Sequence, residues 1–438
     1  MNDEISSLLR RLGVTRGARH IRPAAAPVGG GQELHSARDD LYGTPPPREH
    51  LLPGGRVVEA EDGACFVVDR VYPIQHRHGD DTLADLLTAD PTAATPYGLD
   101  SRIAGNDFRD FLFLDTETTG LAGAGTLAFM VGVAFFEPHT TIADGQTEEG
   151  DVLVVRQYFL RDHGDEPEML HQLDDMMADK AGLITFNGKS FDVPLLDSRY
   201  LMNRRRGRLL EMPHIDLLAP ARRLFRSRLG SCALGSLEQN LLGLRRTQDD
   251  VPGWMIPSLY LDYLRSGDAR RLTGIFYHNE MDMLSMVTLA SRIFRQLATS
   301  RCDHPIDQLS LGRWQADLGL DDLAENTLRS ALEGDLSMEA YHQALYRLGM
   351  LYKQSDRRSE AAVVWQQIAS TATDDVSAHI ELAKYYEWYE DDLPAAIQWT
   401  RQAISLVERW PLTPRARLDH ADLRHRLERL ERKAFRPV

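Results

Sequence analysis

Two acids, Asp115 and Glu117, have the types and spacing that could do chemistry. They lie in the stretch 111–121, FLFLDTETTGL, where four large apolar residues precede them and Thr-Thr-Gly follows. The apolar run predicts a buried strand that ends in a polar turn, and side chains alternate along a strand, so both acids should point to one face. Two like charges this close are unfavourable unless a cation or a proton lies between them, which indicates a metal site. The alternative is a turn capped by Asp115 with Glu117 solvated, so other residues must decide.

A third acid, Asp192, follows the short apolar run 182–188, GLITFNG, which predicts a buried strand that runs into a turn. We expect a helix to begin near Ser190, which places Asp192 at the start of that helix and beside the sheet. Taken singly, Asp192 could simply cap the helix N-terminus, where an acid is favoured by up to about 1 kcal/mol.

A fourth acid, Asp282, lies in a helical run that continues to Phe294. His278 is four residues before it, a spacing that stacks the imidazole and the carboxylate on one helical face, whereas Tyr277 points away. Taken singly, this pair could be a surface contact.

The composition is that of an ordinary globular protein: 438 residues, 43% hydrophobic and 26% charged. No apolar run approaches the roughly 18 residues of a membrane span, and the N-terminus has acids and no signal-peptide core, so we expect a cytoplasmic protein. Three widely separated cysteines argue against a thiolate zinc site and a disulfide framework. The net charge of −15 argues against bulk attraction to nucleic acid but allows a local basic track.

The sequence before the acid motifs divides into two segments. Residues 1–55 are rich in Pro and Gly, which predicts a flexible arm, and residues 56–106 contain a hairpin signal around Asp62-Gly63. His76 and His78 alternate in the second segment and could share a strand face. Without a third ligand they are better explained as exposed or core-satisfied histidines.

Residues 107–300 have a mixed α/β pattern. Apolar runs predict strands at 111–114, 127–137 and 151–160, a helix at 166–180, and then the strand and helix around Asp192. Three strands in succession suggest antiparallel neighbours. This order of elements matches a ribonuclease H-like fold, a mixed sheet flanked by helices.

Residues 306–438 change to helices with an internal repeat. Aligned 18-residue blocks begin at Leu311, Leu348 and Leu382, which are 37 and 34 residues apart. Small residues recur at two positions of the block, Gly312, Gly349 and Ala383 at one and Ala324, Ala361 and Ala395 at the other. The blocks resemble tetratricopeptide repeats, and an amphipathic helix at 415–434 would cap the stack.

The motifs LDTETTGL, TFNGKSFD and HNEMD together place Asp115, Glu117, Asp192 and Asp282 in order. In this order they resemble the four acids of the DEDD-type 3′-5′ exonuclease superfamily, across residues 107–298. With LGSLEQNLLGLRRTQDDVPG between the last two motifs and repeat-like helices behind, the chain resembles the bacterial family of ribonuclease H-like predicted exonucleases.

The resemblance implies two divalent cations, Mg²⁺ or Mn²⁺, which prefer carboxylate and water ligands. Asp115 would bridge both ions, Glu117 and Asp282 would complete one site, and Asp192 would act through coordinated water. His278 would be the general base. Superfamily members place His five residues or Tyr four residues before the last Asp, whereas this chain has His at four and Tyr at five. The helical-face argument favours His278, and its register leaves the base open.

Candidates for contact with nucleic acid lie beside the acid motifs and in an Arg-rich stretch: Thr118, Asn187, Lys189, Arg204, Arg205 and Arg206. Residues 199–228 contain nine arginines against two acids in a chain that is acidic overall. These arginines could form a phosphate track, or they could be solvated faces and partners of acids elsewhere.

The leading hypothesis is a metal-dependent 3′-5′ exonuclease that acts on single-stranded RNA or DNA. A ribonuclease H proper takes its glutamate from a helix, and a DxE at the first strand's end favours exonuclease over hybrid-specific endonuclease action. The alternative is a weak or inactive nucleic-acid-binding scaffold whose repeats recruit a protein partner. A third hypothesis makes the repeats alone the functional half.

Overall fold

The computed structural model describes residue 52 and residues 54–60, 63–120, 125–143, 146–247, 249–372, 375–409 and 414–435. Almost the whole of the expected arm at 1–55 lies outside these residues, as does Asp62 in the expected hairpin turn. No helix among the described residues is long and apolar enough to cross a membrane.

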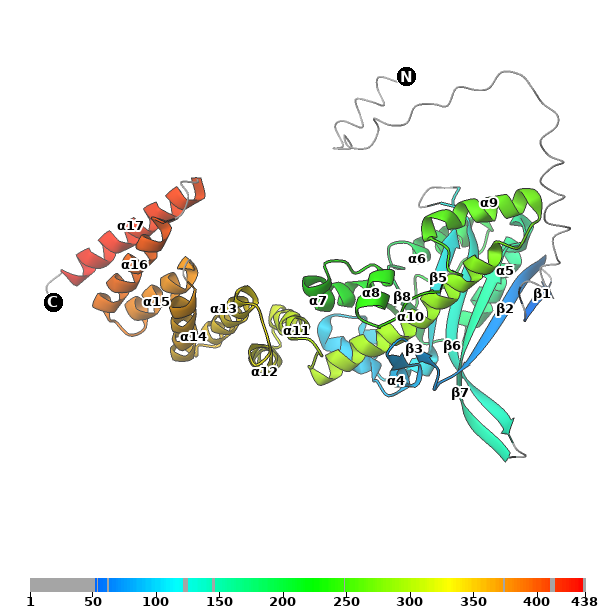
Figure 1. Cartoon of the computed structure of the whole chain (residues 1–438), viewed down its shortest axis with the longest axis horizontal. Coiled ribbons are helices and arrows are strands. Elements are labelled where there is room, and N and C mark those ends of the chain that lie inside the picture. The colour runs from blue at the N-terminus through cyan, green and yellow to red at the C-terminus, as the bar shows by residue number, and fades with distance from the viewer. Residues whose placement is uncertain are drawn as a thin grey trace, which may run out of the picture. The chain divides into compact units, whose positions relative to one another are not determined.

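The described part of the chain contains a central sheet of seven strands in the order β1-β2-β7-β6-β5-β8-β9 (Figure 1). The strands are β1 (Gly55–Ala60), β2 (Gly63–Pro73), β5 (Phe111–Thr118), β6 (Ala128–Ala143), β7 (Gln146–Phe159), β8 (Gly182–Thr185) and β9 (His214–Asp216). Neighbours from β1 to β5 are antiparallel, and β5, β8 and β9 are parallel. The prediction of three successive antiparallel strands is therefore confirmed, and the segment 56–73 adds two more strands to the same sheet.

Helices accompany this sheet on both faces. They are α4 (Ala84–Leu87), α5 (Glu166–Met177), α6 (Asp192–Met202), α7 (Leu218–Leu229), α8 (Leu234–Asn240), α9 (Ile256–Ser266) and α10 (Leu272–Thr299). Short 3₁₀ turns include η5 (Gly253–Met255), and a small ribbon is formed by β3 (Arg77–His78) and β4 (Asp81–Thr82). The predicted order of three strands, a helix, a strand and a helix is confirmed.

Strand β5 lies inside the sheet and is buried on both faces. Phe111 and Phe113 belong to one hydrophobic cluster, whereas Leu112 and Leu114 belong to the other, and all four side chains are fully buried. This alternation is the consequence of the two-residue strand period. The strand continues beyond the predicted apolar run to Thr118, so both acids lie on it, on the face of Phe111 and Phe113.

Helix α10 connects the two hydrophobic clusters. Ile275 and Phe276 pack in the cluster of Leu112, and Met283, Leu284 and the apolar residues that follow pack in the cluster of Phe113. The helix contacts β5, β6 and β7 and runs beside the sheet (Figure 1). Its first half therefore lies against the strand that carries the acids.

Residues 305–435 contain only helices in their described part. They are α11 (Pro305–Asp317), α12 (Asp321–Leu332), α13 (Met338–Gln354), α14 (Arg358–Thr371), α15 (Val376–Trp388), α16 (Leu393–Val407) and α17 (Pro414–Ala434). Consecutive helices pack as neighbours, with the strongest contacts within α11–α12, α13–α14 and α15–α16. An α/β domain followed by an all-α region is thus confirmed, while the tetratricopeptide assignment stays a prediction.

Small residues let the helices of a pair approach. A Cβ on Gly312 would lie 2.9 Å from Leu328 Cγ, and one on Gly349 would lie 2.5 Å from Trp365 Nε1. The third block differs, because α16 begins one residue later in its block than α12 and α14 do. The fully buried alanine there is consequently Ala396, and Ala395 is only half-buried.

We predict that Gly349→Leu destabilises the helical region by about 1–3 kcal/mol, because the new side chain must displace the buried Trp365 ring. Val363→Leu on α14 is the matched control, since Val363 is exposed and the change should stay within about 0.5 kcal/mol. Urea unfolding of both variants measures the difference, and equal midpoints would contradict the packing described here.

Candidate active site

The structure brings Glu117 on β5 together with His278 and Asp282 on α10. One ligand atom from each of the three side chains lies within 4.8 Å of the others. Asp115 is two residues before Glu117 on the same strand, and Asn279 Nδ2 on α10 donates a 3.0 Å hydrogen bond to Asp115 Oδ2. The shared face predicted for the two β5 acids therefore faces α10.

Asp192 lies in the first turn of α6 and is buried. Thr116 Oγ1, between the two β5 acids, donates a hydrogen bond to Asp192 Oδ1. Because Val193 and Leu196 of α6 pack in the cluster of Leu112 and Leu114, Asp192 approaches the end of β5 from the face of Thr116, opposite to that of Asp115 and Glu117. The four predicted acids thus converge on the end of one strand from two sides.

Burial and mutual repulsion shift the pKa values of these acids. Burial, then the charges of Asp192, Asp282 and Glu117, raise the pKa of Asp115 well above its usual value. Burial, then Asp282 and Asp192, do the same to the pKa of Glu117. Burial raises the pKa of Asp192 to about 6 and also raises that of Asp282, on which Arg246 and His278 act in the opposite direction. The site therefore holds more negative charge than its own cations balance.

The carboxylate set fits a hard divalent cation. Asp115, Glu117, Asp192 and Asp282 would supply oxygen ligands, and for Asp115 and Glu117 the charges of the neighbouring acids add to burial in raising the pKa. Mg²⁺ and Mn²⁺ favour such ligands, and binding one would relieve the repulsion.

His278 is oriented by a second acid that the sequence analysis did not select. Its Nδ1 lies 2.7 Å from Asp250 Oδ1, and its Nε2 lies 3.6 Å from Asp282 Oδ2. Arg246 Nη1 lies 3.2 Å from the same Nδ1, so Asp250 and Arg246 together fix the orientation of the ring. The helical-face argument for His278 is supported, because Tyr277 instead accepts a hydrogen bond from the backbone of Thr247.

Comparisons with known proteins agree with this fold. A family model described as the RNase H superfamily matches residues 112–294, which contain all four acids and His278. The uncharacterized protein YprB of Bacillus subtilis (strain 168) is 31% identical over 355 residues, covering 79% of this chain and 81% of the relative. The chain belongs to this RNase H-like family.

In this RNase H-like site a buried chain of amides positions Asp115. Gln157 Nε2 on β7 donates to Asn279 Oδ1 at 3.0 Å and to the carbonyl of Phe276 at 2.8 Å, and Asn279 in turn donates to Asp115. Gly132 pairs with Asp115 across β5 and β6, and a Cβ there would lie 2.1 Å from Asn279 Oδ1. The missing side chain at Gly132 therefore makes room for the Asn279 amide.

A second network surrounds Arg246, which lies between α8 and η5. Its guanidinium donates to Glu238 at 2.5 and 2.8 Å and to Asp282, and it lies 3.6 Å from Asp250. Behind Glu238, Ser285 Oγ donates to Glu238 Oε1 at 2.7 Å. Arg246 is thus an internal counter-ion of the RNase H-like site that its flanking sequence, LGLRRTQDD, did not single out.

The network reaches the segment before the RNase H-like match. His78 on β3 has its Nε2 2.8 Å from Ser285 Oγ, and burial lowers its pKa to about 4. Among the described residues, Glu117, His278 and Asp282 form the group that could hold a metal ion, and neither His76 nor His78 belongs to it. The explanation of His78 as a core-satisfied histidine is supported.

Three of the candidates for nucleic-acid contact lie near the acids. Thr118 ends β5, and its Oγ1 donates to the carbonyl of Gly120 at 2.7 Å. Asn187 and Lys189 lie in the exposed turn before α6, where both backbone amides donate to the carboxylate of Asp216. Asn187 has a positive φ of 69°, which the turn requires.

The other three candidates, Arg204, Arg205 and Arg206, follow the far end of α6. This helix has 11 residues, so they lie about 15 Å along its axis from Asp192. Arg205 Nη1 lies 3.4 Å from His171 Nδ1, and Arg206 is 3.4 Å from Glu211. These three arginines are therefore remote from the acid cluster.

Several arginines of the Arg-rich stretch have acidic partners. Arg199 pairs with the buried Glu166, Arg228 with the buried Asp307, Arg208 with Asp174 and Arg223 with Asp317. The interpretation of the stretch as partners for acids elsewhere in the chain accounts for these four residues.

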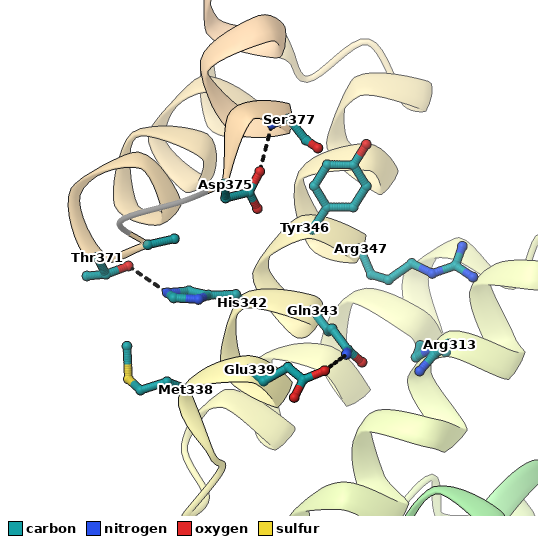
Figure 2. A pocket seen from close by; sticks show the side chains of 11 residues that line it. Arg313, Met338, Glu339, His342, Gln343, Tyr346, Arg347, Thr371, Asp375 and Ser377 are labelled. Carbon is teal, nitrogen blue, oxygen red and sulfur yellow. Dashed lines mark hydrogen bonds between the residues drawn. The ribbon is translucent and has the colours of Figure 1, made fainter. Parts of the chain in front are cut away.

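Two cavities of similar size lie in different parts of the chain. One, of about 780 Å³, is lined by His278, Asp282, Arg246 and the loop up to Gly253. The other, of about 770 Å³, lies in the helical region and is lined by residues that include Arg313 and Tyr346 (Figure 2). Only the first contains residues of the acid cluster.

Metal-free protein should lose stability as the pH rises. Folding raises the pKa of Asp192 from 3.8 to about 6 and those of Asp115 and Glu117 further above their usual values, so folding favours the protonated acids. That contribution is complete below about pH 4 and is lost as the pH rises through about 6. We predict that Glu117→Gln is more stable than wild type at pH 8, by the order of 1–3 kcal/mol, and that the two converge at pH 5.

Urea unfolding in the presence of a chelator tests this pH dependence, with Glu333→Gln as the control because Glu333 is exposed. Adding Mn²⁺ at pH 8 should stabilise wild type more than Glu117→Gln. A wild-type stability that is the same at pH 5 and pH 8 without metal would contradict the electrostatic description.

Gly132→Ala should weaken the site while leaving the sheet folded. The new methyl group must displace the Asn279 amide, which frees Asp115 from its hydrogen bond. Loss of such a supporting contact typically costs 10–100-fold in metal affinity. Titration calorimetry with Mn²⁺ measures the effect, and Gly150→Ala on β7 is the control because nothing lies within 4 Å of its added methyl group. Equal affinities for the two variants would contradict the role given to Gly132.

Proposed function

We propose that the protein is a metal-dependent 3′-5′ exonuclease that hydrolyses phosphodiester bonds of single-stranded RNA or DNA. The observation that carries this proposal is the convergence of Asp115, Glu117, Asp192 and Asp282 on the end of β5, with His278 beside Glu117 and Asp282. An RNase H superfamily domain supports nuclease-like chemistry in general, and the proposal adds the type of nuclease.

The four acids would hold two Mg²⁺ or Mn²⁺ ions. When bound, such a pair of cations stabilises negative charge on the attacking and leaving oxygens of a phosphodiester. Asp115 is fixed by Asn279 and Asp192 by Thr116, so neither carboxylate needs to reorganise to bind. Arg246 balances part of the charge of Asp282.

His278 is the proposed general base. Asp250 at Nδ1 holds the imidazole in one orientation and stabilises the positive charge that forms when Nε2 accepts a proton from the attacking water. Glu117, from the strand and not from a helix, supports exonuclease over hybrid-specific endonuclease action.

We further propose that residues 107–300 form the nuclease domain and that residues 306–438 bind a protein partner through repeats of the tetratricopeptide type. The small-residue contacts of Gly312 and Gly349 support the repeat interpretation. The cavity in Figure 2 offers a surface for the partner, and its lining contains both basic and acidic side chains: Arg313, Arg347, Glu339 and Asp375.

End-labelled single-stranded oligonucleotides incubated with Mn²⁺ or Mg²⁺ should be shortened from the 3′ end. The double variant Asp115→Asn with Glu117→Gln should abolish shortening. His278→Ala should slow it by about 10²–10⁴-fold, the usual contribution of general acid-base catalysis. His342→Ala, in the helical region, is the control and should cut like wild type.

Shortening and binding of the labelled strand distinguish an exonuclease from a nucleic-acid-binding scaffold. Shortening that survives the double variant, or no shortening by wild type with either metal, would refute the exonuclease proposal. Metal-independent binding without turnover would support the scaffold alternative.

A further inference from the structure

The most exposed tryptophan of the described residues is next to the acid cluster. Trp254 is 81% exposed and lies in η5, directly after Gly253. Gly253 lines the cavity of His278 and Asp282, and a methyl group on its Cα would lie 3.9 Å from His278 Nε2. Consecutive Cα atoms are about 3.8 Å apart, so Trp254 is one residue from the backbone that packs on the proposed base.

The backbone that carries Trp254 is held in place by the core. The amide of Met255 donates to the carbonyl of Pro252 at 2.8 Å, which closes the turn. Helix α9 follows immediately, and its Ile256 and Tyr260 are buried, with Tyr260 stacked on Phe129 at 4.0 Å between ring centroids. The backbone at Trp254 is therefore held in place, and a ligand that binds the indole has to order the side chain alone.

The surroundings of Trp254 suit a nucleic acid. The adjoining cavity is lined mainly by polar groups, including the exposed Arg245 and Asn240, and leads to the acids. An apolar protein partner would need a wider apolar surface around the ring, whereas Pro252 and Gly253 next to it are exposed and small. Stacking on an aromatic ring tolerates any base, because every base has a π-face, and a basic residue beside it can meet the phosphates.

We propose that Trp254 is the stacking platform for a nucleobase in the terminal nucleotides of a single-stranded substrate, beside the bond that is cut. This inference rests on the proposed exonuclease function and adds to it the residue that engages the base. It explains how a large aromatic side chain can remain in solvent next to a charged site.

The test measures binding separately from cutting. The full chain carrying Asp115→Asn is titrated against 5′-labelled single-stranded oligonucleotides, intact or with an abasic residue at one of the last three positions, and anisotropy gives Kd. Adding Trp254→Ala should raise Kd for the intact strand roughly five- to hundredfold, and Trp254→Phe should retain most of the affinity. Trp388→Ala, which removes an exposed tryptophan from α15, should leave Kd unchanged.

The abasic strands identify the contact. One abasic position should weaken binding by the protein that has Trp254 and cause no further loss in Trp254→Ala. The inference is overturned if Trp254→Ala binds the intact strand normally, if every abasic position costs the same with and without Trp254, or if no strand binds. If Trp254→Ala in the otherwise wild-type chain shortens oligonucleotides as well as wild type does, the exonuclease proposal stands and the platform is rejected. If the losses from Trp254→Ala and from one abasic position are coupled but wild type cuts no strand, the platform stands and the exonuclease proposal is rejected.

Discussion

The repulsion among four carboxylates at the end of β5 is the constraint on which the rest of this domain depends. A sheet interior ordinarily excludes charge, and here the apolar residues Phe111 to Leu114 lead directly into acids whose pKa values are raised by burial and by one another. Such an arrangement persists only if the surrounding fold is stable enough to impose it. The cores on both faces of β5 and the long helix α10 supply that stability.

The supporting contacts are polar groups inserted between apolar layers. Gln157 and Asn279 are fully buried. Asn279 fixes one oxygen of Asp115, and Gln157 fixes Asn279. Arg246 is held by Glu238 at the same time as it meets Asp282, so its charge cannot move freely into the space between the acids. The fold thus separates the charges that stay fixed from those that a cation can neutralise.

The parts of the site that the sequence predicted are those with a local period. Strand alternation placed Asp115 and Glu117 on one face, and the four-residue helical spacing paired His278 with Asp282. Gly132, Gln157, Arg246 and Asp250 have no such signal, because their partners are set by which strands and loops become neighbours in the folded chain. Gln157, which with Arg156 interrupts the apolar run DVLVVRQYF, was a signal that could have been noticed.

The fold, like the site, was predicted only where the hydrophobic period is a local signal. The order of strands and helices followed from hydrophobic period, but β6 and β7 extend further than their apolar runs, since backbone pairing between the two strands continues where side-chain burial ends. The later start of α16, which moves the buried alanine by one position, depends on the turn before it and on no repeat pattern.

The bond between His78 and Ser285 bears on where this enzyme-like unit begins. A fragment starting at residue 107 would retain every acid of the site, yet it would lose β1 and β2 and leave the edge of β7 without its partner. It would also uncover Ser285 and Glu238, the groups behind Arg246. The segment 56–106 therefore supports the site from outside the proposed nuclease domain, through the pairing of β2 with β7 and the contact of His78 with Ser285.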